Sequence, residues 1–381
     1  MKRKWLVPVI VLGVLALILI LVWPMAPVWQ KLGLEPVCIQ GSWPELKLVP
    51  CSGQEQAVPS TQMLLPTPGA DGPIPIIVDD DGSPDGMVAL LYFLRNPLFD
   101  VQAVTISYGE AHPEKFAPLL ANVLASFGDN ADILVGYGSD APLEGINAFP
   151  DPWREASDDF WGHPPENPAA QKPIPAVQLI VETVKNSPQP VMIFISGSHT
   201  NLAEALRLDP SIVGNIRSVY IMGGAVNVPG NIHSDWQAFD NEVAEWNIWV
   251  DPLAASEVFT SSLDLHLIPL DATRQVAWTR DDLPGWESSG SDASELAASL
   301  LKWMLDNWSS DGVYIWDLVA AVQATNMATC PEVPLALDVV TAPGLEQGRT
   351  LTVDTSPNVS VCLDPDPARM KALVLSVFQQ P

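Results

Sequence analysis

Residues 74–87 read IPIIVDDDGSPDGM, and this stretch decides the fold class. Residues 74–78 are mostly apolar and predict a short strand, residues 79–86 form an acidic turn, and apolar side chains then recur at helical spacing from Met87 to Leu94. Ser83 and Pro84 suit the N-cap and the first position of that helix. A strand that leads through a polar turn into a helix is the opening unit of an α/β sheet.

The same alternation continues along the chain. Further strands are expected at residues 101–107, 133–135, 191–195 and 218–222, and further helices at residues 113–127, 175–186 and 201–207. The pattern predicts an open, mainly parallel sheet with helices on both faces.

Two segments depart from this alternation. Residues 138–172 crowd Pro, Asp and Trp together, which is typical of a long surface loop that can act as a lid. After Cys330, short Val-rich segments at 338–340, 350–353 and 359–363 predict a small β-rich extension before the last helix.

The N-terminus predicts a membrane anchor. Three basic residues, Lys2 to Lys4, precede an apolar run from Trp5 to Trp23, which is long enough to cross a bilayer. Basic residues on the short side keep that end in the cytoplasm and place the body outside it. Residues 1–30 are therefore expected to be a cytoplasmic tip and anchor, 31–72 a Pro/Gly-rich linker, and 73–381 the globular domain. A cleaved signal peptide, which would give a secreted protein, is the alternative.

Four cysteines are present, and in an extracytoplasmic body they can oxidise. We expect Cys38 to pair with Cys51 and Cys330 with Cys362, although four cysteines allow three pairings. No two of them have C-x-x-C spacing, which argues against a metal site built from cysteine.

Charge and composition narrow the class of function. Of the 381 residues, 45 are acidic and 18 basic, a formal charge of −27, which argues against nucleic-acid binding. Apolar residues make up 48%, enough for a large core.

The acidic turn places Asp79, Asp80, Asp81 and Asp85 at the carboxyl end of the predicted first strand, where open α/β sheets bind ligands. Such carboxylates repel one another unless protons or a hard cation such as Ca²⁺ or Mg²⁺ neutralise them. An acidic turn that simply caps a helix N-terminus explains the same residues. A third interpretation is the nucleophile loop of haloacid-dehalogenase-type phosphatases, with Asp79 as nucleophile and Asp81 as general acid, but no lysine is placed convincingly after a strand.

Six further segments follow the turn in a telling order. They are AVTISYGE at 103–110, FISGSHTNLA at 194–203, VYIMGGA at 219–225, AEWNIWVDP at 244–252, IPLDAT at 268–273 and IWDLVAA at 315–321. Together with the turn they resemble the inosine–uridine-preferring nucleoside hydrolase family over about residues 74–375. Each motif is weak alone, but the ordered series is specific.

The resemblance implies a Ca²⁺ site and a hydrolytic role. Asp81 and Asp317 match carboxylate ligands of the ion, and Ser196 matches a ligand that offers its backbone carbonyl. Asp85 matches the general base that takes a proton from the attacking water. Nearby negative charge would stabilise an oxocarbenium-like ribosyl transition state.

The resemblance also implies ribose contacts. Glu245, Asn247 and Met222 match ribose-binding positions, and Asn231 supplies a further contact, with Asn241 as its rival because the alignment contains an insertion. Each of these has an ordinary structural explanation, since such side chains also cap helices and shape turns.

The departures from the family pattern concern the same site. Gly86 stands where the family has an Asp that binds Ca²⁺ through two oxygens, so Gly86→Asp would be expected to tighten Ca²⁺ binding. Asp80 is an extra acid that could compensate, although strand alternation points it away. Glu110 replaces a common Asn and is a candidate for binding ribose or the ion.

The residues expected near the leaving base also depart from the family pattern. Trp316 replaces a His that is a candidate acid for the leaving base, and its indole can stack on that base. His112 and His233 are candidate acids in pocket-side loops, and ordinary surface positions explain both equally.

The sequence therefore predicts hydrolysis of the N-glycosidic bond of ribonucleosides, with Ca²⁺ as cofactor and a small nucleoside as partner. A catalytically silent relative that binds nucleosides is the alternative, and a phosphatase is the minor one. Members of this family often form dimers or tetramers, so a homo-oligomer is compatible with the resemblance.

Overall fold

The computed structural model describes residues 37–40, 47–50, 68–70, 72–128, 130–163, 165 and 171–380. The chain divides into two units, residues 1–63 and 64–381. In the first unit, strands β1 (Val37–Gln40) and β2 (Lys47–Pro50) pair antiparallel, with Cys38 opposite Val49. Cys51 lies outside the described residues, so the pairing of Cys38 with Cys51 stays a prediction.

The predicted membrane anchor, Trp5 to Trp23, also lies outside the described residues. Among the described residues, no helix has the length and apolar character needed to span a bilayer.

The second unit is built on a nine-stranded sheet with the strand order β12-β15-β9-β8-β7-β3-β4-β5-β6. Neighbouring strands run parallel throughout, except that β12 pairs antiparallel with β15. The strands are β3 (Ile74–Asp80), β4 (Phe99–Ile106), β5 (Leu134–Tyr137), β6 (Ile174–Pro175), β7 (Val191–Ile195), β8 (Ile216–Met222), β9 (Leu265–Ile268), β12 (Glu332–Leu335) and β15 (Val359–Cys362). The predicted open, mostly parallel α/β sheet is confirmed.

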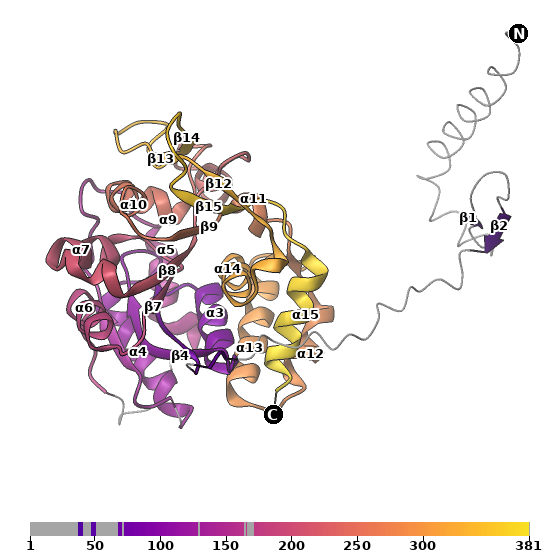
Figure 1. The fold of residues 1–381 in the computed structure, drawn as a ribbon. Coiled ribbons are helices and arrows are strands. Elements are labelled where there is room, and N and C mark those ends of the chain that lie inside the picture. Colours follow the sequence, from indigo (N-terminus) through magenta and orange to yellow (C-terminus); the bar gives the residue numbers. More distant parts are fainter. Residues whose placement is uncertain are drawn as a thin grey trace, which may run out of the picture. The chain divides into compact units, whose positions relative to one another are not determined.

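Helices cover both faces of this sheet (Figure 1). One layer contains α6 (Ala176–Asn186), α7 (Thr200–Leu208) and α10 (Pro252–Phe259), which pack on one another. The opposite layer contains α3 (Pro84–Arg95), α12 (Leu283–Glu287), α13 (Asp292–Asn307), α14 (Trp316–Thr325) and α15 (Pro367–Phe378). The buried strands read as continuous apolar runs because both of their faces are covered.

Apart from α4, the remaining elements are short. They are α4 (Pro113–Ser126), α5 (Asp151–Asp158), α8 (Ile232–Asp235), α9 (Trp246–Val250), α11 (Leu270–Thr273), the 3-10 helices η2 (Phe160–Gly162), η3 (Pro210–Asn215), η4 (Arg280–Asp282) and η5 (Met327–Thr329), and the strand pairs β10 (Ala277–Trp278) with β11 (Val313–Tyr314) and β13 (Leu337–Val339) with β14 (Thr350–Thr352).

The strand order places a topological switch point beside β3. Strands β4, β5 and β6 follow on one side of β3, and β7, β8 and β9 follow on the other. In open α/β sheets the crevice at the carboxyl ends of the strands beside such a point binds the ligand. The acidic turn after β3 lies at this crevice, and its helix begins as predicted, because the Ser83 hydroxyl accepts a hydrogen bond from the Gly86 amide and Pro84 follows at the first position.

The prediction of a long loop at 138–172 is wrong in part. Helix α5 and the 3-10 helix η2 lie within it. The buried side chains of α5 are Arg154 and Ser157, so this helix has no apolar stripe that its sequence could reveal. Arg154 lies over the Tyr108 ring, donates to the Ala111 carbonyl oxygen and pairs with Asp140, which fixes α5 to the sheet.

The β-rich extension predicted after Cys330 is present, with β13, β14 and β15 at the three predicted segments. Only β13 and β14 form a pair of their own, whereas β15 joins the main sheet beside β9 and β12 forms its edge. Val359, Val361 and Cys362 are buried there, so this edge extends the core.

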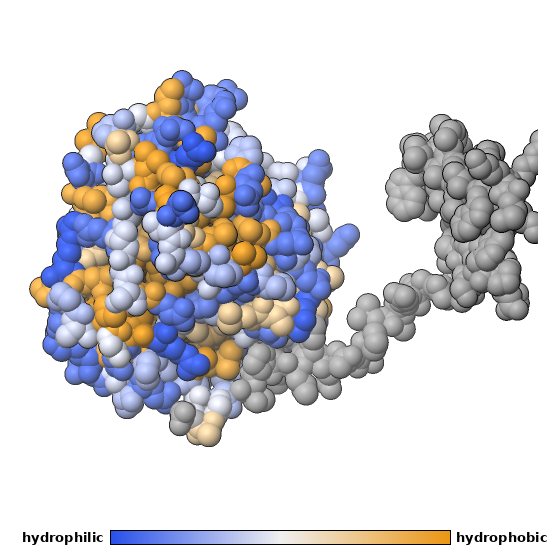
Figure 2. Space-filling model, turned by 45° about the horizontal axis from the view of Figure 1, so that its top comes forward, coloured by the Kyte–Doolittle hydropathy of each residue, from blue (hydrophilic) through white to orange (hydrophobic). Residues whose placement is uncertain are grey.

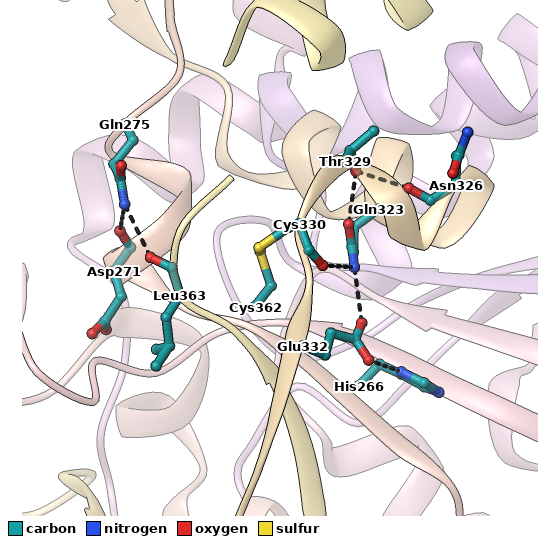
Figure 3. The surroundings of a disulfide bond; sticks show 10 residues. All are labelled: His266, Asp271, Gln275, Gln323, Asn326, Thr329, Cys330, Glu332, Cys362 and Leu363. Carbon is teal, nitrogen blue, oxygen red and sulfur yellow. Dashed lines mark hydrogen bonds and ion pairs between the residues drawn. A yellow bond between two sulfur atoms is a disulfide. The ribbon is translucent and has the colours of Figure 1, made fainter. Parts of the chain in front are cut away.

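The predicted disulfide between Cys330 and Cys362 is present, and Figure 3 shows its surroundings. The Gln323 side-chain amide of α14 donates to the Cys330 carbonyl oxygen at 2.8 Å and to a Glu332 carboxylate oxygen at 3.0 Å. The disulfide region is therefore tied to the C-terminal half of α14.

The surface does not present a large continuous apolar area on the face drawn in Figure 2, where apolar patches are interrupted by hydrophilic side chains. The exposed large hydrophobic side chains in the described part of the chain come from separate segments, among them Ile146, Leu208 and Leu345. Scattered exposed hydrophobic side chains of this kind are ordinary on a folded domain.

Candidate active site

A cavity of about 450 Å³ opens at the carboxyl ends of β3, β7 and β8. The part that carries most of its polar side chains, which we call the floor, consists of Asp81, Ser83, Asp85, Glu110, Ser196, Met222, Asn231, Glu245, Asn247 and Asp317, and Asp235 is a further polar residue of the lining. Its aromatic part, which we call the aromatic wall, consists of Phe149, Trp153, Trp161, Trp246, Trp303, Trp308 and Trp316. This one cavity is lined by the residues to which the resemblance gives a catalytic, metal-binding, ribose-binding or base-stacking role, whereas the rival candidates Asn241, His112 and His233 do not line it.

The three consecutive aspartates of the acidic turn point in different directions. Asp79 turns away from the cavity and accepts hydrogen bonds from Thr105 Oγ1 at 2.6 Å and Asn201 Nδ2 at 2.8 Å. Asp80 accepts from the Gly82 amide and from Ser196 Oγ, both at 2.8 Å. Asp81 alone of the three lines the cavity, because β3 ends at Asp80 and the chain turns at Gly82, where φ is 84°.

Asp80 does not line the cavity, but it does not turn away from the acidic group as strand alternation suggests. Asp79 is the residue that turns away, while the Asp80 carboxylate lies directly against Gly86. The phosphatase interpretation is disfavoured, because Asp79, its required nucleophile, is fully buried and does not line the cavity.

Asp81 has one oxygen bound and one free. Its Oδ2 accepts a hydrogen bond from the Glu110 amide at 3.1 Å, whereas its buried Oδ1 has no hydrogen-bond partner. A buried carboxylate oxygen without a partner carries the full cost of lost hydration, so this atom needs a proton donor or a cation.

Asp85 and Asp317 meet across two helix N-termini. Asp85 lies in the first turn of α3 and Asp317 in the first turn of α14, and the Ser83 hydroxyl donates to Asp317 Oδ2 at 3.3 Å. The pKa of Asp85 is raised chiefly by burial, and that of Asp317 is raised well above its usual range by burial and then by repulsion from Asp85 and Asp80. The helix N-termini favour negative charge here, which partly offsets this repulsion.

The remaining acids in and beside the floor also have raised pKa values. Burial and neighbouring carboxylates hold the pKa values of Asp81 and Glu110 well above their usual ranges, and burial raises the pKa of Asp80 to about 7. The floor therefore gathers more negative charge than it can neutralise with its own side chains.

Ser196 follows the last residue of β7 and is held from two sides. Its amide donates to the Asp79 carbonyl oxygen at 2.9 Å, and its carbonyl oxygen accepts from Asn247 Nδ2 at 3.3 Å. Asn247 also donates to the Met222 carbonyl oxygen at 3.2 Å, so it links the ends of β7 and β8.

Glu245 caps helix α9, as an ordinary structural role would require. Its carboxylate accepts hydrogen bonds from the amides of Asn247 and Ile248 and from the Gly224 amide. Burial raises its pKa to about 7. It lines the cavity as well, so a capping role and a role in ligand binding are compatible in the same side chain.

The structure separates the two asparagines that compete for the further ribose contact. Asn231 lines the cavity, and its buried Oδ1 has no partner. Asn241 instead accepts from the amides of Val243 and Ala244 and donates to the Gln347 carbonyl oxygen, so its side chain shapes a loop outside the cavity lining.

The two histidines considered as acids for a leaving base do not line the cavity. His112 pairs with Asp158 at 2.7 Å, and His233 Nδ1 lies 2.8 Å from the Phe239 carbonyl oxygen. The described lining contains no Lys, Arg or His, and residues 164–170 contain none in the sequence.

Sequence reasoning missed most of the aromatic wall. Only Trp316 was singled out, whereas Phe149, Trp153 and Trp246 form one contacting group and the Trp pairs 161–303, 303–308 and 308–316 form another. The available signal was the count of 14 tryptophans, concentrated in part at 153–161 and 303–316. Trp161 has a φ of 53°, an uncommon backbone conformation for a bulky residue.

A metal ion would need more than the acidic side chains. In the described part of the chain, no group of three or more Asp, Glu, His or Cys side chains is arranged to hold an ion by itself. The residues nevertheless suit a hard cation, because Asp81 Oδ1 lacks a partner and the carboxylates of the floor and the Ser196 carbonyl at the end of β7 offer oxygen atoms. Water and ligand hydroxyls would complete the coordination shell.

Comparisons with known proteins agree with this geometry. The family model for inosine-uridine preferring nucleoside hydrolase matches residues 76–372. The pyrimidine-specific ribonucleoside hydrolase RihA of Citrobacter koseri is 29% identical over 303 residues, covering 77% of this chain and 94% of that protein. The corresponding protein of Salmonella arizonae is 30% identical over 305 residues, with the same coverage.

Solved structures show the same fold. A plant nucleoside hydrolase, the PpNRh1 enzyme, superposes with a TM-score of 0.70 at 26% identity and covers 81% of this chain and all of its own. An inosine-uridine preferring nucleoside hydrolase from Bacillus anthracis superposes with a TM-score of 0.65 at 24% identity, covering 80% of this chain and 99% of its own.

The fold and the cavity thus define an open, mostly parallel α/β scaffold with a cavity whose floor carries several carboxylates. The chain belongs to the inosine–uridine-preferring nucleoside hydrolase family.

Proposed function

We propose that this protein hydrolyses the N-glycosidic bond of ribonucleosides, with a Ca²⁺ ion at the floor and Asp85 as the general base. The observation that carries the proposal is the meeting of Asp81, Asp85 and Asp317 at the floor of a cavity large enough for a nucleoside, in a chain whose family match spans that floor.

The floor residues would have two different roles, metal binding and proton transfer. Asp81, Asp317 and the Ser196 carbonyl oxygen would hold Ca²⁺, which when bound lowers the pKa of a water molecule and orients ribose hydroxyls. Asp85 accepts the proton of the attacking water. Its position in the first turn of α3 keeps this carboxylate buried and aimed into the cavity.

The ribose would lie against the floor. Glu110, Met222, Asn231, Glu245 and Asn247 supply hydrogen-bond acceptors, donors and one apolar contact around it. Cleavage builds positive charge on the anomeric carbon and the ring oxygen of the ribose, and the surplus of carboxylates at the floor stabilises that charge.

The base would lie against the aromatic wall. No basic side chain of the described lining can protonate it, so stacking on indole rings such as Trp316 binds and polarises it instead. The relatives are named for pyrimidine and for inosine–uridine substrates, so both base classes are candidate substrates here.

The test is release of free ribose from the purified full-length protein supplied with Ca²⁺ and inosine, uridine or adenosine in parallel. We expect ribose from at least one substrate, and its loss when a chelator is added. Absence of ribose from all three would overturn the proposal of hydrolysis.

A catalytically silent nucleoside-binding protein is the second candidate, and Gly86 and Trp316 favour it, because they replace a usual metal ligand and a candidate leaving-group acid. Binding of a nucleoside without ribose release would support it. Release of phosphate from a small phosphoester would instead support the phosphatase alternative.

We also propose that residues 1–30 anchor the protein in the cell membrane with the hydrolase domain outside the cytoplasm. The support is the run of apolar residues from Trp5 to Trp23 behind three basic residues. Retention of the full chain in the membrane pellet after alkaline extraction is the expected result. Recovery in the soluble fraction would favour a cleaved signal peptide.

A further inference from the structure

The space beside Gly86 is too small for a side chain. A Cβ atom built on Gly86 would lie 1.7 Å from Asp80 Oδ2 and 2.6 Å from Asp80 Cγ. Gly86 is not one of the glycines with a positive φ, so its backbone could accept any side chain. The Asp80 carboxylate therefore occupies the volume into which a side chain at position 86 would project.

This contact corrects the expectation that Gly86→Asp tightens Ca²⁺ binding. The new side chain would overlap the Asp80 carboxylate, and two buried carboxylates cannot share that volume. An acid at position 80 and an acid at position 86 are alternatives in space, and this chain has the first where the family pattern has the second.

Asp80 is well fixed but retains binding capacity. Each of its oxygens accepts one hydrogen bond, Oδ1 from the Gly82 amide and Oδ2 from Ser196 Oγ. A carboxylate has about four acceptor sites, so each oxygen keeps a free lone pair. The bond to Ser196 Oγ places Asp80 beside the residue whose carbonyl oxygen is a candidate ligand.

A second observation points to a ligand at the same place. The neighbouring Asp81 is 2% exposed, lines the cavity and has an Oδ1 atom without a hydrogen-bond partner. Since Asp80 and Asp81 are adjacent in the turn and Asp85 follows it, a cation that satisfies Asp81 Oδ1 would lie within the same group of carboxylates.

We propose that Asp80 takes over the cation-holding role that an acidic side chain at position 86 would otherwise perform, so that the metal site is rebuilt from the end of β3 instead of the start of α3. The inference rests on the cation of the proposed function, but it concerns binding and can be tested apart from hydrolysis. It predicts that the two positions compensate each other.

The experiment is a Ca²⁺ titration by calorimetry of the full-length protein and three variants: Asp80→Ala, Gly86→Asp, and the combination of both. Asp80→Ala should weaken Ca²⁺ binding by about 10-fold to 100-fold, the range seen when residues that support a metal site are removed. Gly86→Asp alone should lower the melting temperature or weaken binding. The combined variant should recover most of the lost affinity, because the aspartate at 86 then enters the vacated volume.

Two controls keep the result interpretable. Asp292→Asn removes an exposed carboxylate in the first turn of α13, outside the cavity lining, and should leave the Ca²⁺ affinity within a few-fold of wild type. If Asp80→Ala does not fold, Asp80→Asn keeps an oxygen acceptor for Ser196 or Gly82 and should still weaken binding.

The outcomes separate the two proposals. Equal Ca²⁺ affinity in wild type and the Asp80 variants, no recovery in the combined variant, or no Ca²⁺ binding by the wild type would each overturn the inference. Ca²⁺ binding with the predicted compensation but no ribose release would leave the inference standing and overturn the hydrolase proposal.

Discussion

The floor and the aromatic wall of the same cavity differ in how the chain encodes them. Floor residues lie at or after the ends of β3, β4, β7 and β8 or at the starts of α3, α8, α9 and α14, so each belongs to a local strand–turn or helix-start motif. Wall residues lie in α5, η2, α9, α13 and α14, just before α5 or just after α13, and most of them belong to no strand–turn motif. The floor holds charge, while the wall offers ring surface, so the two regions should fail in different ways when mutated.

The largest expected effect is at the floor. Asp85→Asn keeps the shape of the side chain but removes its ability to accept a proton, so kcat should fall by about 10²- to 10⁴-fold. Inhibition by free ribose, which reports binding at the floor, should change little. Rates of ribose release measured for the variant check this.

Asp292→Asn is the matched control, because Asp292 also lies in the first turn of a helix, α13, but is exposed and does not line the cavity. It should keep near-native turnover. If Asp85→Asn also kept near-native turnover, Asp85 would only shape the start of α3. The floor would then differ from the wall in charge but not in a catalytic role of Asp85.

The second test asks whether a floor residue depends on a remote covalent link. The disulfide joins residues with a sequence separation of 32, and α14, which begins with Asp317 at the floor, ends beside it. Replacing Cys330 and Cys362 with Ala should lower the free energy of unfolding by about 3–4 kcal/mol, on the chain-entropy estimate for a loop of this size. Denaturant unfolding measures this.

Catalysis at a temperature where the disulfide-free variant remains folded should be unchanged, because α14 is also held by α3 and α15. A large loss of kcat in a variant shown to be folded would mean that the disulfide positions Asp317. The floor would then depend on tertiary constraints as much as the wall does.

Sequence reasoning succeeded where short motifs and elements coincide. The acidic turn and its helix cap, the strand at 191–195 and the predicted pair Cys330–Cys362 were found because each depends on local composition, spacing or oxidation chemistry. The site residues offered by the family resemblance all line one cavity for the same reason, since each sits at a strand end or helix start.

The failures have physical causes of another kind. Helix α5 was missed because its buried residues are Arg154 and Ser157, which make no apolar stripe. The direction of Asp80 relative to Asp81 was misjudged because Asp81 lies past the end of β3, where strand alternation no longer applies. Most of the wall was missed because tryptophans that look like ordinary core residues meet at a cavity only through distant segments.

A third test concerns a buried histidine that does not line the cavity. His199 precedes α7, is fully buried, and neither of its ring nitrogens has a hydrogen-bond partner. Burial lowers its pKa to about 3 from the ordinary 6.5. The unfolded chain therefore binds a proton below pH 6.5 that the folded chain does not bind until about pH 3, so the stability contributed by this group is full above pH 6.5 and is lost as the pH falls.

The prediction is a difference between two proteins. On going from about pH 7 to about pH 4.5, the wild type should lose about 2–3 kcal/mol more stability than His199→Leu, because the variant lacks the titrating group. Carboxylates with raised pKa values act in the opposite direction, but they are common to both proteins and cancel. If the free energy of unfolding changed with pH equally in the two proteins, water would reach His199 in the folded protein.

The smallest expected effect is at the wall, and it should be specific for the base. Trp303 lies in α13, contacts Trp161 with ring centroids 6.2 Å apart and Trp308 with centroids 6.0 Å apart, and lines the cavity. A stacked aromatic pair contributes about 0.5–1.5 kcal/mol beyond burial, so Trp303→Leu should lower kcat/KM by about 2-fold to 13-fold. The loss should be larger for inosine than for uridine, because a purine has more ring area to stack.

Free ribose separates this effect from damage to the floor. Ribose has no ring system to stack, so its inhibition constant should be the same in Trp303→Leu and in wild type, whereas Asn247→Ala, a floor variant, should weaken it. If Trp303→Leu weakened ribose and nucleosides equally, the substitution would have disturbed the floor, and the two regions would form one cooperative unit. If it changed neither, the base would bind elsewhere in the cavity, against Phe149, Trp153 and Trp246, which form the other aromatic group.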